Sequence, residues 1–253
     1  MTALKMTSLE FEYPETKVLQ GIDLTLEAGE HVGVIGPNGV GKTSMFHSVC
    51  GVLKPSSGKV EIFGETVKAG QFNPDVGLVF QYPDDQLFSP TVWDDVLFGP
   101  LNMGLDRAEA EARTECALKE TGMFDLKDRA PHHLSGGQKR MVAIAGIRAM
   151  KPRLVLYDEP SANLDMRSRR QLIEFMKTSH ETVLVSSHDL ELILEVSQRV
   201  VLVDEGKIIA DGDPVEILGN VELMEKHGLE RPHSLIPHVH TSEAGYHTHS
   251  HSH

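Results

Sequence analysis

A glycine-rich segment directly after a short apolar run constrains the fold of this chain more than any other feature. Residues 31–35 are typical of a buried strand, and residues 36–43 then read GPNGVGKT, the pattern G-x-x-x-x-G-K-[ST]. Glycines let successive backbone N–H groups point inward, and residues 43–49 can form a helix whose positive end completes an anion cradle. A chance glycine-rich turn would lack this leading strand and following helix. The spacing therefore predicts a nucleoside triphosphate site, with Lys42 on the β- and γ-phosphates and Thr43 on Mg²⁺.

The predicted phosphate loop extends into the first turn of the helix. The residues that we expect to contact the nucleotide there are Gly36, Pro37, Asn38, Gly39, Val40, Gly41, Lys42, Thr43 and Ser44.

Length and composition predict a globular protein. With 253 residues, 40% hydrophobic and 24% charged, the chain can bury the core of one α/β domain with a smaller appended subdomain. The net charge of -13 argues against nucleic acid as the main partner and against direct adhesion to anionic lipid, because Lys and Arg bind such phosphates. No apolar run approaches the about 18 residues of a membrane span, and the first residues lack the apolar stretch of a secretory signal. We therefore expect any membrane contact to pass through another protein.

Apolar patterning predicts two groups of strands. Alternation of apolar and polar residues predicts an N-terminal antiparallel sheet from segments 9–13, 22–26 and 59–64. Apolar runs separated by helical patterns predict a parallel sheet that ends in a hairpin, from segments 76–80, 154–157, 182–185 and 200–210. A helix over 107–121 is expected between these groups, with Asp106 and Glu109 as a capping box.

The strand at 154–157 ends in two acids, Asp158 and Glu159. Such a pair can merely solvate a strand end or cap a helix. Together with a phosphate loop, however, it favours catalysis, because the carboxyl end of a parallel strand lies near the bound phosphates. Asp158 is then expected to anchor Mg²⁺, and Glu159 is the candidate general base that polarises the attacking water.

A third motif precedes the amphipathic run 139–150. Ser135 and Gln138 have the spacing of a capping box, and the glycines between them leave backbone N–H groups open to an anion. The pentapeptide alone favours an ordinary capped helix. A second phosphate site would be redundant for one nucleotide, unless it serves the nucleotide held by another subunit. The motif consists of Leu134, Ser135, Gly136, Gly137 and Gln138.

The order of these motifs resembles that of the ATP-binding subunits of ABC transporters, from about residue 9 to residue 216. Residues 134–138 resemble the LSGGQ signature of that family, and the phosphate loop and the acidic strand end resemble its Walker A and Walker B motifs. Gln81 resembles the Q-loop glutamine, Asp165 the D-loop aspartate and His188 the switch histidine. Tyr13 lies where the family stacks an aromatic ring on adenine.

The resemblance implies an α/β P-loop NTPase fold: a cassette with a mixed or parallel sheet core, an N-terminal antiparallel β subdomain and an α-helical subdomain. The ATPase domain would span residues 1–230, and its helical subdomain about 84–150. ATP and Mg²⁺ are the implied cofactors, with Thr43, Gln81 and Asp158 around the metal.

The resemblance also implies a mechanism that needs a second cassette, either an identical copy or a sister ATPase. The two cassettes would face head to tail, and Ser135 and Gly137 of one would contact the γ-phosphate held by the other. His188 would bond the γ-phosphate and orient water with Glu159, while Gln81 would relay its occupancy to the helical subdomain.

A closer resemblance, to the ATPases of energy-coupling-factor importers in their cobalt and nickel branch, lies in residues 81–100. It implies docking on a transmembrane coupling protein, a substrate-binding membrane component, and a peripheral location on the cytoplasmic face of the cell membrane. Importers of other micronutrients, such as vitamins, remain an alternative substrate class. Trp93 departs from the acidic residue expected at its place, and an exposed aromatic there would suit an interface anchor.

A tail from residue 231 to 253 is rich in histidine and is expected to be disordered. Imidazoles suit Ni²⁺, Co²⁺, Zn²⁺ and Cu²⁺, so the tail is a candidate transition-metal site. A plain polar tail or the remnant of a purification tag would have a similar composition. The candidate ligands are His238, His240, His247, His249, His251 and His253.

Two functions of other classes compete with transport. The first is a cassette ATPase that acts on the ribosome or on DNA; such proteins generally carry two cassettes or a long coiled-coil insertion, and this sequence has neither. The second is a protein that sequesters metal with its tail and uses the cassette for regulation.

Overall fold

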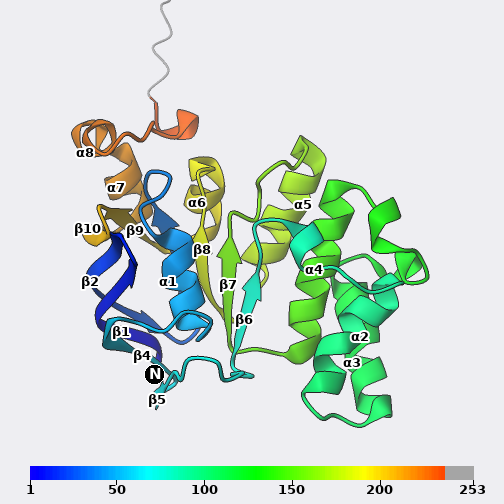
Figure 1. Cartoon of the computed structure of the whole chain (residues 1–253). Coiled ribbons are helices and arrows are strands. Elements are labelled where there is room, and N and C mark those ends of the chain that lie inside the picture. Colours follow the sequence, from blue (N-terminus) through cyan, green and yellow to red (C-terminus); the bar gives the residue numbers. More distant parts are fainter. Residues whose placement is uncertain (237–253) are drawn as a thin grey trace, which may run out of the picture.

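Two β-sheets and the helices around them form the part of the chain that the computed structural model describes, residues 1–236 (Figure 1). One sheet has the strand order β2-β1-β4-β5 and the other β10-β9-β3-β8-β7-β6. The strands of the first sheet are β1 (Thr2–Tyr13), β2 (Thr16–Glu27), β4 (Ser57–Ile62) and β5 (Glu65–Thr66). Those of the second are β3 (His31–Ile35), β6 (Val76–Val79), β7 (Leu154–Asp158), β8 (Thr182–Ser186), β9 (Arg199–Asp204) and β10 (Lys207–Gly212).

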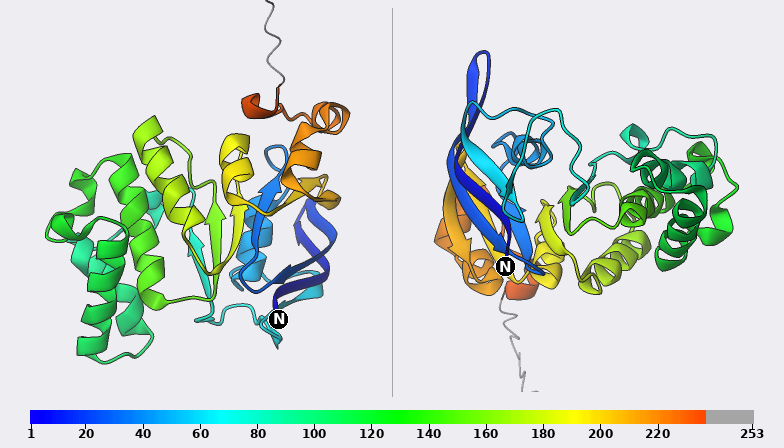
Figure 2. Two further views of the ribbon diagram at one scale, coloured as in Figure 1. Left: turned by 180° about the vertical axis from the view of Figure 1, so that it is seen from behind. Right: turned by 90° about the horizontal axis from the view of Figure 1, so that it is seen from below.

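The N-terminal sheet is antiparallel, as its alternating segments predict. Its first two strands are much longer than the segments 9–13 and 22–26, because bulges interrupt the alternation on which the prediction depended. The β1–β2 register shifts between Met6 and Leu9, and Ser8 has a left-handed backbone with φ 45°. The twisted hairpin of these two strands stands out at one side of the molecule in Figure 2.

The second sheet is parallel except for β10, which pairs with β9 as the predicted hairpin. Alternate residues of its strands enter two separate cores. In β7, Leu154 and Leu156 join the core beneath the N-terminal sheet, whereas Val155 and Tyr157 join the core on the opposite face. Because β3, β8 and β7 are parallel neighbours, the segments that follow them leave the sheet at the same edge.

The helices before residue 200 divide into three sets. Between the two sheets lies α1 (Lys42–Val49), which packs in the core beneath the N-terminal sheet. Helices α5 (Met166–Lys177) and α6 (Leu190–Val196) cover the other face of the second sheet. A helical group stands apart from the N-terminal hairpin (Figures 1 and 2). It consists of α2 (Val92–Asn102), α3 (Arg107–Glu120) and α4 (Gly136–Met150), with short 3-10 turns at Pro83–Asp85, Phe124–Leu126 and Pro131–His133.

Two expectations in the helical group are corrected. Asp106 caps α3 by accepting a bond from the Glu109 N–H, but the Glu109 carboxylate pairs with Arg113, one turn on, so the reciprocal half of the capping box is missing. Trp93 is no exposed anchor. It is half-buried against the hydrophobic core, and the Lys127 ammonium lies 5.7 Å from its ring centroid.

The C-terminal helices α7 (Pro214–Gly219) and α8 (Val221–Lys226) are followed by a 3-10 turn at His233–Leu235. Ser234 donates two hydrogen bonds to the Glu191 carboxylate, from its N–H at 3.0 Å and its hydroxyl at 2.7 Å. The chain therefore stays attached to the body through the first residues of the predicted tail, and the six tail histidines lie outside the described residues. None of the helices within residues 1–236 combines the length and apolarity that a bilayer span needs.

Candidate functional site

A pocket of about 890 Å³ lies at the edge of the second sheet where β3, β7 and β8 end. Segments that are far apart along the chain line it, from the end of β1 to the loop after β8. The predicted residues that it brings together are Tyr13, Asn38, Gly39, Gly41, Lys42, Thr43, Ser44, Gln81, Asp158, Glu159 and His188.

Glycine is required at two points of the loop before α1. At Gly36, φ is 150°, and a Cβ would lie 2.0 Å from the Val203 carbonyl oxygen of β9. At Gly41, φ is 104°, and a Cβ would lie 2.9 Å from side-chain atoms of Val18 and Leu19. Gly41 is also the N-cap of α1 and offers no side chain to bond the N–H groups of the first turn. Those groups are therefore available to an anion, as the motif predicts.

Lys42 places its ammonium inside this loop. Its Nζ donates to the carbonyl oxygens of Gly36 at 2.8 Å and Pro37 at 3.0 Å, and lies 3.4 Å from the His188 Nε2. Burial lowers the pKa of Lys42, and the nearby carboxylates of Glu159 and Asp158 act against that shift. The result is a fixed cation between the phosphate loop and the acidic strand end.

Asp158 at the end of β7 is buried and accepts two hydroxyl bonds. The Thr43 hydroxyl donates to its Oδ2 at 2.7 Å, and the Ser186 hydroxyl of β8 donates to its Oδ1 at 2.6 Å. A carboxylate and a hydroxyl in contact are the oxygen ligands that Mg²⁺ prefers. Within the described residues, the buried Oε1 of Glu159 also accepts no hydrogen bond. The oxygen atoms of Thr43, Asp158 and Glu159 at this edge of the sheet therefore fit the ligands of a hydrated cation.

Glu159 and His188 are joined directly. The Glu159 backbone is left-handed with φ 46°, and its N–H donates to the Ser186 carbonyl oxygen at 3.0 Å. Its Oε2 accepts the His188 backbone N–H at 3.0 Å, while its Oε1 lies 3.4 Å from the His188 Nε2. The carboxylate of the candidate base is therefore oriented by the backbone of the candidate switch residue.

Tyr13 and Gln81 also line the pocket. The Tyr13 ring is 49% exposed and packs edge-on against Phe11, with 4.9 Å between centroids, so one ring face is free for stacking. The Gln81 carbonyl oxygen accepts a bond from the Arg140 Nη2 at 2.5 Å, and the Phe80 carbonyl accepts a second from the same guanidinium. Burial lowers the pKa of Arg140 to about 10. This contact between α4 and the Q-loop was not predicted from the sequence.

The signature residues 134–138 do not line the pocket of their own chain. Ser135 and Gln138 form both halves of the predicted capping box at the start of α4. A Cβ on Gly137 would lie 2.1 Å from the Ser168 hydroxyl oxygen of α5. Asp165 caps α5 by accepting bonds from Ser168, and it too lies outside the pocket lining. The starts of α4 and α5 therefore pack together beside the pocket.

Two charged residues that line the pocket, Arg169 and Asp189, were not predicted. Asp189 could have been found from the sequence, since it follows His188 and precedes an apolar helical run, as an N-cap does. Arg169 gives no such signal, because its partner lies 20 residues away in another helix.

Known proteins are similar to this chain over most of its length. A putative ABC transporter ATP-binding protein of Synechocystis is 50% identical over 234 residues, which are 92% of this chain and 82% of that protein. An energy-coupling factor transporter ATP-binding protein, EcfA, of Methanothermobacter thermautotrophicus is 45% identical over 90% of this chain and 76% of that protein.

Solved structures give the same fold. The structure of CbiO1 from Clostridium perfringens, described as part of the ABC transporter complex CbiONQ, has a TM-score of 0.79 at 36% identity and covers 89% of this chain and 94% of its own. A nucleotide-free cassette from an ABC transporter matches in fold alone, with a TM-score of 0.78 at 22% identity over 89% of this chain and 98% of its own. The family model described as ABC transporter matches residues 19–162. Together these findings show that the chain belongs to the ABC transporter family, as an ATPase that binds ATP in this cassette.

Proposed function

We propose that this ATPase powers an energy-coupling-factor importer for cobalt or nickel ions, as one of two cassettes bound to membrane subunits at the cytoplasmic face of the cell membrane. The observation that carries the proposal is the convergence of Lys42, Thr43, Asp158, Glu159 and His188 on one pocket. A protein that bound a nucleotide without hydrolysing it would not need a base and a histidine held against each other beside the phosphate loop.

Each of these side chains has a role in the proposed hydrolysis. Lys42 neutralises charge on the β- and γ-phosphates, and His188 bonds the γ-phosphate. Glu159 orients and polarises the in-line water through its Oε1, which accepts no hydrogen bond from residues 1–236. Thr43 and Asp158, with Gln81, would hold Mg²⁺, which neutralises further charge on the phosphates.

A second cassette completes the site in this proposal. The signature residues lie on the start of α4, outside the pocket of their own chain, with backbone N–H groups at a helix start. Head-to-tail pairing would bring Ser135 and Gly137 to the γ-phosphate held by the other chain. ATP would then favour the closed pair, and its hydrolysis would remove that preference.

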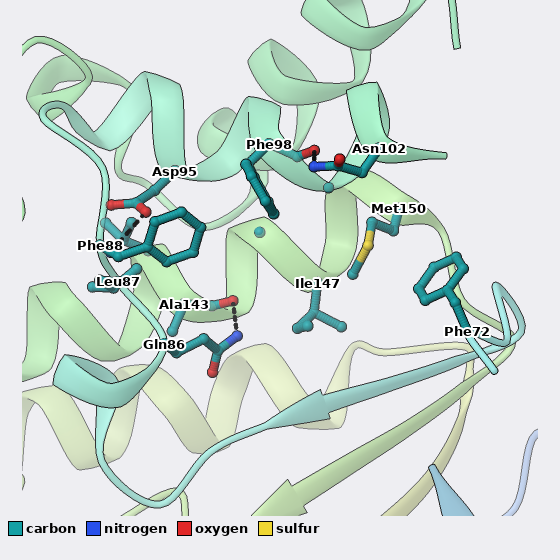
Figure 3. Close-up of a pocket in the computed structure, with 13 residues that line it drawn as sticks. Phe72, Gln86, Leu87, Phe88, Asp95, Phe98, Asn102, Ala143, Ile147 and Met150 are labelled. Carbon is teal, nitrogen blue, oxygen red and sulfur yellow. Dashed lines mark hydrogen bonds between the residues drawn. The ribbon is translucent and has the colours of Figure 1, made fainter. Parts of the chain in front are cut away.

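A groove in the helical group is the proposed docking site for the transmembrane coupling protein. It has a volume of about 520 Å³ and is lined mainly by apolar side chains from the Q-loop region, α2 and α4 (Figure 3). Phe88 and Phe98 stand at one side in an edge-to-face pair with centroids 4.9 Å apart. Both rings are largely exposed, and exposed paired aromatics are typical of protein interfaces.

The chemistry of Asp95 narrows the partner. This carboxylate lines the groove, and its Oδ1 accepts the Phe88 N–H at 3.0 Å (Figure 3). The same oxygen accepts the Ser89 N–H at 3.0 Å. Its Oδ2 is buried and has no donor among residues 1–236. Because this carboxylate lies in the wall of an otherwise largely apolar groove, we expect a partner with an apolar face and one cationic side chain to occupy it.

The substrate class rests on the relatives and on composition. Relatives include EcfA proteins, and the similar CbiO1 is described as part of a CbiONQ complex. The histidine-rich tail adds a compositional link to transition metals. A vitamin importer would share the ATPase machinery and the docking groove, so substrate measurements must separate the two.

The test compares metal uptake with ATPase activity. Cells that lack this chain are expected to lose uptake of radiolabelled Co²⁺ or Ni²⁺, and the unaltered chain, but not Glu159→Gln, should restore it. Metal analysis of the co-purified membrane component should identify the same ion. Normal uptake of both ions in the deletion strain would refute the metal importer and leave an ABC ATPase with another substrate.

A further inference from the structure

An ion pair joins helix α5 to the loop that carries His188. Arg169 of α5 donates from Nε to the Asp189 Oδ2 at 2.5 Å and from Nη2 to the Asp189 Oδ1 at 2.8 Å. Two parallel bonds between a guanidinium and a carboxylate fix both distance and orientation. Because both side chains are largely buried, solvent screens this pair less than a surface pair.

Asp189 is held on its other sides as well. Its Oδ1 accepts the Leu192 N–H at 3.0 Å as the N-cap of α6, and its own N–H donates to the Ser187 hydroxyl at 3.0 Å. Burial by itself would raise the pKa of the Asp189 carboxyl, but the bonds from Arg169 and the Leu192 N–H lower it overall. The residue after His188 is therefore an ionised anchor, and Arg169 is its cationic partner.

The first turn of α5 contacts the other functional segments too. Asp165 caps this turn through Ser168, and Ser168 fills the space beside Gly137 of the signature motif. Residues 161–164, just before the helix, line the nucleotide pocket. One helical turn thus touches the signature loop, the D-loop and, through Arg169, the loop of His188.

We propose that Arg169 is a positioning residue for catalysis, which holds His188 in place by tying Asp189 to the first turn of α5. Movement of the D-loop when a second cassette closes would then shift His188 through this link. The Glu159 carboxylate would follow, because its Oε2 accepts the His188 backbone N–H. The inference rests on the proposed roles of His188 and Glu159 and adds the element that sets their position.

Arg169→Met tests the link, and the chain supplies a matched control. Arg170, the next residue of the same helix, also forms ion pairs, with Glu174 and Glu195, but on the exposed surface. Loss of Arg169 is expected to lower kcat for ATP about ten- to hundredfold and to change KM much less, because the phosphate loop and Lys42 are left unaltered. Arg170→Met should retain the kcat of the unaltered protein.

Four further variants separate the possible failures. Asp189→Asn keeps an acceptor for the Leu192 N–H but loses the charge, so it should lower kcat as Arg169→Met does, and the double variant should be no slower than either. Arg169→Lys should recover part of the activity. Equal kcat in Arg169→Met and Arg170→Met, or additive losses in the double variant, would overturn the inference. Unchanged kcat in His188→Ala would instead refute the catalytic role on which it rests.

Discussion

Glu159 shows at the scale of one residue how the fold prepares the site. Its left-handed backbone, φ 46°, costs on the order of 1–3 kcal/mol for a residue other than glycine. That conformation turns its N–H onto the Ser186 carbonyl and lets its carboxylate meet the His188 N–H. Asp158, one residue earlier, stays in strand β7 and faces Thr43. Adjacent acids thus acquire different surroundings, as different roles require.

Glu159→Gln is expected to keep ATP binding and lose turnover. The amide oxygen can still accept the His188 N–H, so the loop should keep its shape, but an amide cannot take a proton from water. We expect kcat to fall by about two to four orders of magnitude, and ATP to hold two chains together. ATPase assays and size-exclusion chromatography with light scattering would measure both effects.

Lys42→Ala is the comparison for that experiment. It removes the buried cation that bonds the Gly36 and Pro37 carbonyls, so it should lose both turnover and the ATP-dependent dimer. If Glu159→Gln turned over ATP at the rate of the unaltered chain, another group would have to be the base. If the Glu159→Gln variant remained monomeric with ATP, that result would contradict the composite site.

Among the secondary-structure elements, the starts of α4 and α5 pack tightly against each other near the site. Gly137→Ala would place a methyl group 2.1 Å from the hydroxyl oxygen of Ser168 and 2.5 Å from its Cβ. Because rotation of the hydroxyl cannot relieve the contact with Cβ, α4 or α5 would have to move. A methyl group on the adjacent Gly136 would meet no atom of a neighbouring element within 4 Å. We therefore expect Gly137→Ala to lower the free energy of unfolding by about 1–3 kcal/mol, and Gly136→Ala to leave it unchanged or slightly raised.

Chemical unfolding of the two single-alanine variants without nucleotide would measure this difference. Since both changes fall in the first turn of α4, they share any effect of helix propensity, and only the contact with Ser168 distinguishes them. Equal free energies of unfolding would show that α5 can move away from the added methyl group without cost. The inference that this contact is rigid would then be wrong.

At the scale of the whole molecule, the pocket and the docking groove lie on different parts, and the Q-loop joins them. Arg140 binds the carbonyls of Phe80 and Gln81 at the pocket side, and Gln86 donates to the Ala143 carbonyl at the groove side. The Q-loop, residues 80–86, is thus hydrogen-bonded to α4 at both ends of the loop. A partner in the groove would therefore act on the same helix that carries the signature motif.

Phe98→Asp is expected to abolish co-purification with the membrane partners, because it puts a charge into the apolar groove beside the buried carboxylate of Asp95. Ile209→Asp is the control: Ile209 is 40% exposed, comparable to Phe98 at 49%, but lies on β10 away from the groove. Affinity purification of the complex from membranes would compare them, and ATP binding by each isolated variant would check its fold. Retained complex in Phe98→Asp would exclude this groove as the docking site.

A chain that ends at Ile236 is expected to keep ATP turnover and lose affinity for Ni²⁺. Within residues 1–236 no cluster of three or more His, Cys, Asp or Glu side chains could hold a metal ion, whereas six histidines follow. Isothermal titration with Ni²⁺ on the full and shortened chains would measure the difference. Equal binding by both chains would show that the tail histidines are not the ligands.

Sequence patterns predicted those features that depend on local order along the chain. The phosphate loop, the acidic end of β7 and the capping box of α4 each lie within a few residues, and local geometry imposes their spacing. Strand and helix periods also predicted both sheets, since one face of each element must be buried. Where bulges broke the period, as in β1, the predicted strand was too short.

Which distant residues meet depends on how the elements pack in three dimensions. The pairs Arg169–Asp189 and Arg140–Gln81 join segments 20 and 59 residues apart, and no local rule predicts such partners. The burial of Trp93 likewise depended on how α2 packs against residues 124–127. Local patterns are set by backbone geometry, whereas these contacts are set by how whole elements pack, which a single sequence does not reveal.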